Sequence, residues 1–196
     1  MKILSEILFV ISNGLMIPVL GLLLYLSARA VSLLFAFYKE YSRKKRIAGM
    51  FRHLIQNYSP DGLAMLQTET GEFGDSSVID CLRNIMAHKT DKIYCEHALS
   101  EFHIDVQKQL SRHKALIKFG PMLGLMGTLI PMGPALVGLA SGDIVSMAYN
   151  MQVAFSTTVV GMAVAAIGAV TLQGNKRYYA RSLNDLDFVF QKLNEK

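Results

Sequence analysis

Three long apolar segments dominate the hydropathy pattern of this chain. They run from Ile3 to Leu26, from Phe119 to Ala140 and from Ile144 to Leu172, and each reaches the roughly 20 residues that a membrane-spanning helix needs. Residues between Lys39 and Lys118 are polar enough to lie in water, and a short turn at Ser141, Gly142 and Asp143 separates the last two segments. The pattern predicts an all-α membrane protein with three transmembrane helices.

The polar segments are expected to extend these helices beyond the membrane. One helix should begin near Thr90 or Asp91, and no turn signal interrupts it before Phe119. It is therefore expected to run into the second span as a rod on the order of 70 Å, perturbed at Pro121. Its apolar stripe is predicted to consist of Tyr94, Ala98, Phe102 and Val106, and the C-terminal tail repeats such a stripe with Leu183, Leu186, Phe190 and Leu193.

A shorter helix is predicted in the insert. Breaks at SPDG and ETGEFGDSS precede it, and the long rod follows it. Asp75, Ser76 or Ser77 would cap it, with Asp80 in its first turn. Its apolar positions are Val78, Leu82, Ile85 and Met86. The resulting division of the chain is a first span with its inner extension (1–38), a cytoplasmic helical insert (39–118), a hairpin of two spans (119–175) and a cytoplasmic C-terminal helix (176–196).

Composition and charge agree with a membrane protein. Hydrophobic residues make up 52% of the chain and charged residues only 18%, and the first span lacks the cleavage site of a signal peptide. The net charge of +5 is explained by basic residues at the inner ends of the spans, so nucleic-acid binding need not be invoked. These residues place the N-terminus outside and the bulk of the polar chain in the cytoplasm: Arg43, Lys44, Lys45, Arg46, Lys114, Lys118, Lys176, Arg177 and Arg181.

Catalytic and metal-binding motifs are missing from the sequence. Nucleophile elbows, phosphate-binding glycine loops and HExxH helices do not occur, which argues against an enzyme, and no cofactor is expected. Two cysteines suit a reducing cytoplasm. The polar insert does hold five candidate metal ligands, whose spacing matches no zinc pattern, and ordinary helix packing explains them better: Cys81, His88, Cys95, His97 and His103.

Small residues form a stripe on each of the last two spans. On the second span, Gly120, Gly124 and Thr128 follow one another at four-residue steps, and Pro131 and Ala135 extend the same face. Such stripes let helix backbones approach closely in lipid. Packing is therefore the expected role of Gly120 and Gly124 and of most of the stripe on the third span, which consists of Ala154, Thr158, Gly161, Ala165 and Gly168.

The two threonines and the prolines are harder to assign to packing alone. Pro131 cannot donate a hydrogen bond to the carbonyl of Gly127, and Pro134 cannot donate to that of Ile130, so two acceptors are freed beside Thr128. This arrangement favours a face that lines a water-holding path. Between Phe119 and Gln173 the only ionisable residue is Asp143, at the outer turn. A proton carrier must then come from another chain.

These segments resemble a known family. GLMGTLIPMG resembles the GLLGTVxG motif, and AFSTTVVGMAVAAIGA resembles the ALxATAxGLxxAIPA pattern, of the MotA/TolQ/ExbB proton channel family. The three-span layout is similar to the TolQ/ExbB branch. The resemblance implies a ring-like homopentamer around a dimer of single-span ExbD, TolR or MotB-type partners in the inner membrane, with a partner aspartate carrying protons. Thr128, Thr158 and Gly161 match the motifs, whereas Pro131, Pro134 and Gly168 depart from them.

The resulting hypothesis is a proton-channel subunit of an energy-transducing motor. Its expected ion-path residues are Thr128, Thr158, Gly127, Pro131, Pro134 and Gly161. The main alternative is a structural membrane scaffold that conducts nothing and in which both threonines tolerate alanine or valine. A small-molecule or lipid transporter is disfavoured, since the chain has no inverted repeat and no charged residue within the membrane.

Overall fold

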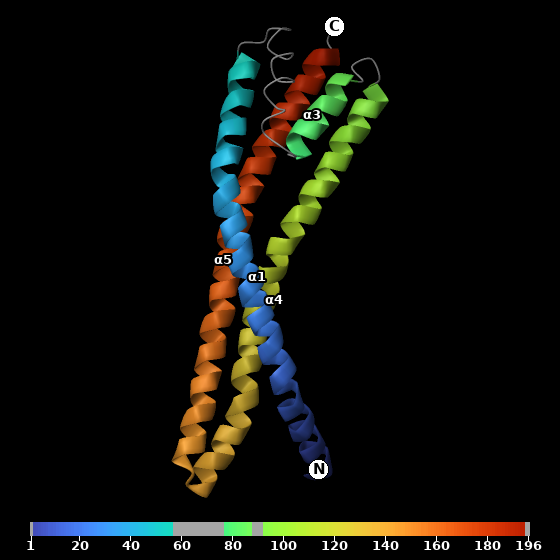
Figure 1. Cartoon of the computed structure of the whole chain (residues 1–196). Coiled ribbons are helices and arrows are strands. Elements are labelled where there is room, and N and C mark those ends of the chain that lie inside the picture. Colours follow the sequence, from blue (N-terminus) through green and yellow to red (C-terminus); the bar gives the residue numbers. More distant parts are fainter. Residues whose placement is uncertain (1, 57–76, 88–91, 195–196) are drawn as a thin grey trace. The chain divides into compact units, whose positions relative to one another are not determined.

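The protein is almost entirely helical (Figure 1). The computed structural model describes residues 2–56, 77–87 and 92–194, and within these ranges it contains no strand. The helices are α1 (Lys2–Gln56), α3 (Ser77–Ala87), α4 (Lys92–Ser141) and α5 (Ile144–Asn194). Three of them, α1, α4 and α5, are long and apolar enough to cross a membrane. The predicted class of three spans with long helical extensions is confirmed, and the ring-like assembly stays a prediction.

Helix α4 confirms the predicted rod. It has 50 residues, which corresponds to about 75 Å at 1.5 Å per residue. Pro121, Pro131 and Pro134 all lie inside it, so the prolines remove backbone donors without ending the helix, and the perturbation expected at Pro121 does not interrupt it. The third span and the C-terminal tail likewise form one helix, α5, of 51 residues.

Contacts within the chain define two compact units. Unit 1 consists of Met1–Phe35 and His113–Thr171, and unit 2 consists of Ala36–Arg112 and Leu172–Lys196. The sequence analysis assigned residues up to 118 to the cytoplasmic insert, whereas these contacts group His113 with the apolar segments. Each unit is therefore described with its own core.

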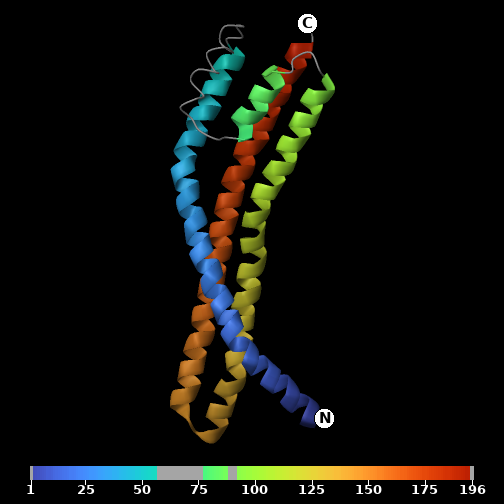
Figure 2. The same ribbon diagram turned by 45° about the vertical axis from the view of Figure 1, so that its right-hand side comes forward.

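Unit 2 has a core of large apolar side chains from α3, α4 and α5, which lie side by side in this unit (Figure 2). The α3 positions Val78, Leu82 and Ile85 are buried as predicted. The α4 stripe differs from the prediction at its first position, because Cys95 is 2% exposed whereas Tyr94 is 41% exposed. The remaining buried members of this core are Cys81, Phe102, Val106, Leu110, Tyr179, Leu186 and Val189.

Unit 1 is a hairpin of α4 and α5 with the first half of α1 packed on one side. The core joins Val19, Leu23, Leu26 and Ala30 of α1 to three hairpin residues, Leu116, Leu123 and Val164. Figures 1 and 2 show the first turns of α1 diverging from the hairpin. The partly buried residues packed against this core are Leu33, Ile130, Val160 and Ile167.

The hairpin turn combines two helix caps in adjacent residues. Gly142 has a φ of +76°, which suits glycine at the end of a helix. The amide of Asp143 donates to the Gly138 carbonyl at 2.8 Å, and that of Gly142 donates to the Leu139 carbonyl at 3.2 Å, which is the Schellman pattern. The Asp143 carboxylate then accepts from the amide of Ser146 at 3.0 Å and caps α5. The predicted turn is confirmed.

Several predictions fall outside the described residues. They concern the breaks at residues 59–62 and 69–76, the caps Asp75 and Ser76, the helix start at Thr90 or Asp91, and the side chains of His88, Met86 and Leu193.

Candidate ion pathway

The two helices of the hairpin touch backbone to backbone at three glycines. A Cβ atom at Gly161 would lie 2.6 Å from the Gly120 carbonyl oxygen and 2.9 Å from the Gly124 Cα atom. A Cβ at Gly120 would lie 2.7 Å from the Gly161 carbonyl oxygen. No side chain fits at these positions, so the glycines set the distance between α4 and α5.

The same close packing continues toward both ends of the hairpin. Gly168 lies against Leu116, whose Cβ atom would be 2.9 Å from a Cβ on the glycine, and against the His113 carbonyl oxygen, at 3.2 Å. Ala154 is buried and Ala165 is half-buried. The small residues that the sequence assigned to packing thus lie along the contact between the two helices.

Gly127 lies inside the hairpin as well. A Cβ atom on Gly127 would lie 2.6 Å from both Cβ and Oγ1 of Thr157. Pro131 is fully buried, whereas Pro134 is half-buried. The carbonyl that Pro131 leaves without a helical donor belongs to Gly127. Because Gly127 packs on α5, protein covers this side of α4 in the single chain. Sequence reasoning passed over Thr157, whose buried hydroxyl donates to the Ala154 carbonyl at 2.8 Å.

Thr128 and Thr158 are half-buried and lie close to the same glycine. The Thr158 hydroxyl is 3.5 Å from the Gly124 carbonyl oxygen of the other helix and 3.4 Å from the Ala154 carbonyl oxygen. Thr128 lies one turn beyond Gly124, and its hydroxyl donates to the Leu125 carbonyl at 2.7 Å. The pair therefore spans α4 and α5 at one level of the hairpin.

Both threonines point away from α1. Ile130 and Val160 pack against the core that α1 forms with the hairpin, and each lies two residues after one of the threonines. Residues two apart on an α-helix point about 160° apart. Within the described part of unit 1, one side of the hairpin is thus covered by α1, and the hydroxyl pair occupies the opposite side.

A second polar pair joins the hairpin helices nearer their other ends. The His113 Nδ1 atom lies 2.9 Å from the Thr171 hydroxyl oxygen, and both side chains are buried. Sequence reasoning missed this pair because it began the second span at Phe119. The signal was available: His113 precedes Gly120 by seven residues, or two turns, and Thr171 follows Gly168 by three, so both continue the small-residue stripes.

The candidate metal ligands of the insert do not gather. Among the described residues, no group of three or more His, Cys, Asp or Glu side chains is placed to hold a metal ion. Cys81 and Cys95 are buried, and their thiols donate to the Ala98 carbonyl at 3.6 Å and to the Ile85 carbonyl at 3.8 Å, respectively. Burial, with a smaller contribution from Cys95, raises the pKa of the Cys81 thiol from its ordinary value of 9.0 to about 11. The Cys81 thiol is therefore protonated at neutral pH, and both cysteines pack in the core of unit 2.

Comparison with protein families identifies the chain. The family model for MotA/TolQ/ExbB proton channels matches residues 77–186, a segment that contains α3, α4, the hairpin turn and most of α5. No curated protein and no solved structure matches the chain. Since the matched segment makes up more than half of the 196 residues, the chain belongs to the MotA/TolQ/ExbB proton channel family.

Proposed function

We propose that this chain is a proton-conducting, stator-like subunit of an energy-transducing motor in the inner membrane, of the TolQ/ExbB branch. Five copies would surround a dimer of single-span partners of the ExbD, TolR or MotB type, and an aspartate of the partner would carry the proton past Thr128 and Thr158. Membership of a proton channel family and three span-forming helices support a multi-pass channel protein.

The observation that carries the proposal is the uncovered side of the hairpin. Each threonine already donates its single hydroxyl proton to a backbone carbonyl of the protein. The oxygen keeps lone pairs that accept a hydrogen bond from water or from a protonated carboxyl group. Two such oxygens, one from each helix and both opposite α1, suit the wall of a path for protonated groups.

The carboxylate must come from outside this chain. Asp143 is the only acidic residue from His113 to Thr171, and it caps α5 at the turn, away from the hydroxyl pair. A membrane potential supplies about 2.3 kcal/mol per elementary charge per 100 mV. Several protons per cycle are therefore enough to drive a conformational cycle in a partner held against the hairpin.

The remaining predicted path residues support the wall from behind. Gly127 and Gly161 lie between α4 and α5, where they bring the two threonines to one level, and Pro131 is fully buried. Half-buried Pro134 follows Thr128 by six residues. The basic residues at the ends of the spans favour an N-terminus outside the cell and a cytoplasmic unit 2.

The experiment measures proton flux into liposomes containing the complex, purified through a tag on this chain. Thr158→Val and Thr128→Val preserve side-chain volume and remove the hydroxyl, and each is expected to lower flux about tenfold, on the scale of losing one well-placed hydrogen bond. Assembly, measured by size-exclusion chromatography, should not change.

Two matched controls separate conduction from packing. Ser156→Ala removes an exposed hydroxyl about 160° around α5 from Thr158 and should leave flux within twofold. Thr157→Val alters the buried neighbour of Gly127 and should change stability more than flux. Full conduction by both Thr128→Val and Thr158→Val would instead favour a structural scaffold and overturn the proposal.

A further inference from the structure

Unit 1 contains three carboxamide side chains, Asn13 of α1 and Asn150 and Gln152 of α5. The Asn150 amide donates to the Ser146 carbonyl at 2.9 Å. Asn13 is half-buried and Gln152 is exposed, and neither side chain forms a hydrogen bond with any described residue of the chain. A carboxamide offers both donors and an acceptor, so these two side chains keep their full capacity to bind another molecule.

Both side chains lie at a depth where hydrocarbon surrounds the protein. Gln152 precedes Thr158, the middle residue of the predicted third span, by six residues, or about 9 Å along the helix. Asn13 lies near the middle of the first predicted span, Ile3 to Leu26. The hydrocarbon core extends about 15 Å to either side of its centre. Because an amide without a hydrogen-bond partner is costly there, each is expected to gain a partner in the assembled protein.

Packing within unit 1 places the two carboxamides at similar levels. A Cβ atom on Gly138 would lie 3.2 Å from the Met147 amide nitrogen, so α4 and α5 are level at these residues. The two helices are antiparallel, and Gly133 and Gln152 are each five residues farther from the turn, which makes them level as well. A Cβ atom on Gly133 would lie 3.3 Å from the Phe9 ring of α1. Helix α1 therefore contacts α4 at the level of Gln152.

The two carboxamides lie on opposite sides of α4. Gln152 precedes Gly161, which contacts α4, by nine residues and so points about 180° away from α4. Asn13 follows Phe9 by four residues, one turn along the same side of α1. Figures 1 and 2 show α4 near the turn between α5 and the first turns of α1. The side chains of Asn13 and Gln152 thus cannot reach each other within one chain.

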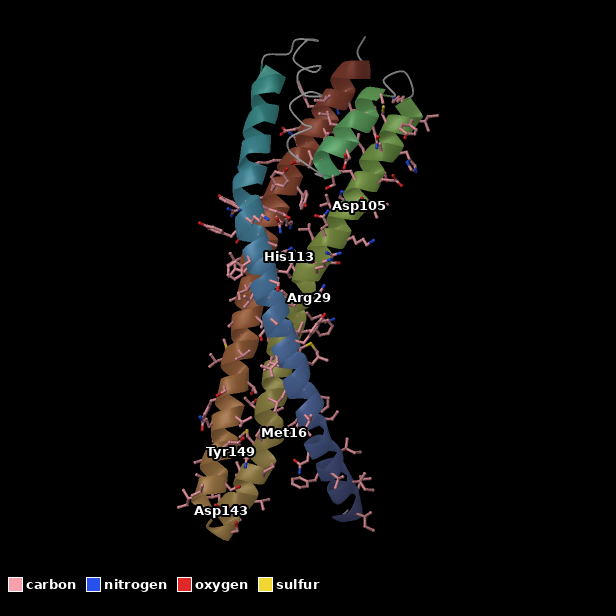
Figure 3. All side chains as sticks on the ribbon, viewed as in Figure 1. Met16, Arg29, Asp105, His113, Asp143 and Tyr149 are labelled. Carbon is pink, nitrogen blue, oxygen red and sulfur yellow. The ribbon has the colours of Figure 1, made fainter. Side chains whose placement is uncertain are left out.

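The neighbours of the two carboxamides agree with this arrangement. Tyr149 precedes Gln152 by three residues and is 65% exposed, so this part of α5 is open. Met16 follows Asn13 by three residues. Figure 3 shows Tyr149 on α5 and Met16 on α1 at similar levels of unit 1.

A second copy of this chain is the occupant that fits the open side of α5. The single-span partner of the proposed function lies against Thr158, which points about 120° away from Gln152. The partner therefore leaves the side opposite α4 uncovered. A neighbouring copy presents Asn13 at the matching depth, and two carboxamides are electrostatically complementary because each donates to the other's oxygen. Contacts between different sides of identical subunits close into rings.

We propose that Gln152 of one copy pairs with Asn13 of the next, and that this polar contact joins α5 to the first half of α1 between neighbouring subunits. The inference rests on the proposed function, in which several copies assemble. It assigns the two carboxamides to the contact between copies, whereas Thr128 and Thr158 face the partner.

Cross-linking in membranes that contain the full-length chain and its partner tests the contact. One tagged copy carries Asn13→Cys and another carries Gln152→Cys. Copper(II)–phenanthroline oxidises the two thiols to a disulfide, which releases two protons and passes two electrons to the oxidant. A covalent dimer of the two copies is expected. Each variant expressed alone reports the background from the buried Cys81 and Cys95.

The matched control pairs Gln152→Cys with Leu24→Cys. Leu24 is 67% exposed and lies 11 residues after Asn13, about three turns farther along the same side of α1. This pair should give at least about tenfold less covalent dimer. An equal yield from the control pair, or a covalent product of Gln152→Cys with the single-span partner instead of the second copy, would overturn the inference.

Removal of the amide tests the same contact without a cross-link. Gln152→Leu keeps side-chain volume, and the purified complex in detergent should dissociate at a protein concentration about threefold higher or more. Asn13→Leu should have the same effect, and the double variant should not exceed the larger single effect, since both changes break one contact. Gln173→Leu, at an exposed glutamine of unit 2, is the control and should not change dissociation.

The outcomes separate this inference from the proposed function. Additive effects of Asn13→Leu and Gln152→Leu would overturn the inference. Normal proton flux by a complex that shows neither the cross-link nor weaker assembly would also overturn it, and would leave the proposed function standing. If the cross-link formed but the wild-type complex carried no protons, the proposed function would fail and the contact between copies would stand.

Discussion

Helices α4 and α5 contact each other in different ways in the two units of this chain. In unit 1 the hairpin helices meet at Gly120, Gly124 and Gly161, and at Gly120 and Gly161 no side chain fits between the backbones. In unit 2 the same two helices, with α3, bury large side chains such as Ile85, Phe102 and Leu186. One pair of continuous helices thus changes its mode of packing along its length.

The difference follows from the solvent that each unit is built for. In water, burying apolar side chains is itself favourable, by roughly 25 cal/mol per Å², so unit 2 gains stability from bulky residues. In lipid the surroundings are as apolar as the core, and close van der Waals contact between backbones replaces the hydrophobic effect. Substitutions that remove side-chain volume should therefore destabilise unit 2, whereas substitutions that add side-chain volume should destabilise unit 1.

The largest effect is expected from lost volume in unit 2. Ile85 is 0% exposed, and Ile85→Ala should destabilise unit 2 by about 2–5 kcal/mol, because it removes buried methyl groups and leaves a cavity. Ile93→Ala, at a position that is 80% exposed, is the matched control and should cost little. Chemical denaturation of the full chain in detergent, followed by circular dichroism, measures both. Equal losses would show that α3 does not form part of a cooperative core.

Added volume in unit 1 should have the next largest effect. In Gly161→Ala the new methyl group would meet backbone atoms of Gly120 and Gly124, which cannot move aside as a flexible side chain does. The expected cost is about 1–3 kcal/mol. Gly21→Ala places a methyl group where nothing lies within 4 Å and should be neutral or slightly stabilising, because alanine is the better helix former.

These two glycine variants are compared by thermal unfolding in detergent and by proton flux. A tolerated Gly161→Ala would mean that α4 and α5 are not in direct backbone contact. In that case the level at which Thr128 and Thr158 meet would also lose its support, so the result bears on the ion pathway as well as on stability.

Periodicity predicted which helices form far better than how each helix is rotated. Hydropathy and the small-residue stripes were sufficient to predict the three spans, the turn between the last two and the close glycines. The stripe of the third span was drawn through Thr158, which does reach Gly124, but it left out Thr157, which packs on Gly127. Where both sides of a helix are apolar or small, spacing leaves its rotation open by about one residue. The same ambiguity explains why Cys95 replaces Tyr94 in the core of unit 2.

The His113 and Thr171 pair was missed for a different reason. A search for spans ends where charged residues begin, and Lys114 and Lys118 ended the second span before His113 was reached. Helix α4 continues through this boundary without a break, so the contact between the hairpin helices extends beyond the apolar segment. Only the packing of α5 against α4 brings Thr171 to the ring.

The smallest effect is expected at the turn, where unit 1 depends on neither close glycines nor large side chains. Asp143→Ala removes the carboxylate that accepts from the Ser146 amide and should cost about 1 kcal/mol, the usual value of an N-cap. Asp143→Asn keeps an acceptor oxygen and should restore most of the loss. Ser141→Ala, whose hydroxyl bonds only to carbonyls of its own helix, serves as the control and should be close to neutral. The three variants are measured by thermal unfolding in detergent at one pH. If Asp143→Ala lowered stability as much as Gly161→Ala, the turn and not the backbone contact would hold the hairpin closed. The contrast between the two units would then have to be explained by the connection between the helices instead of by their solvent.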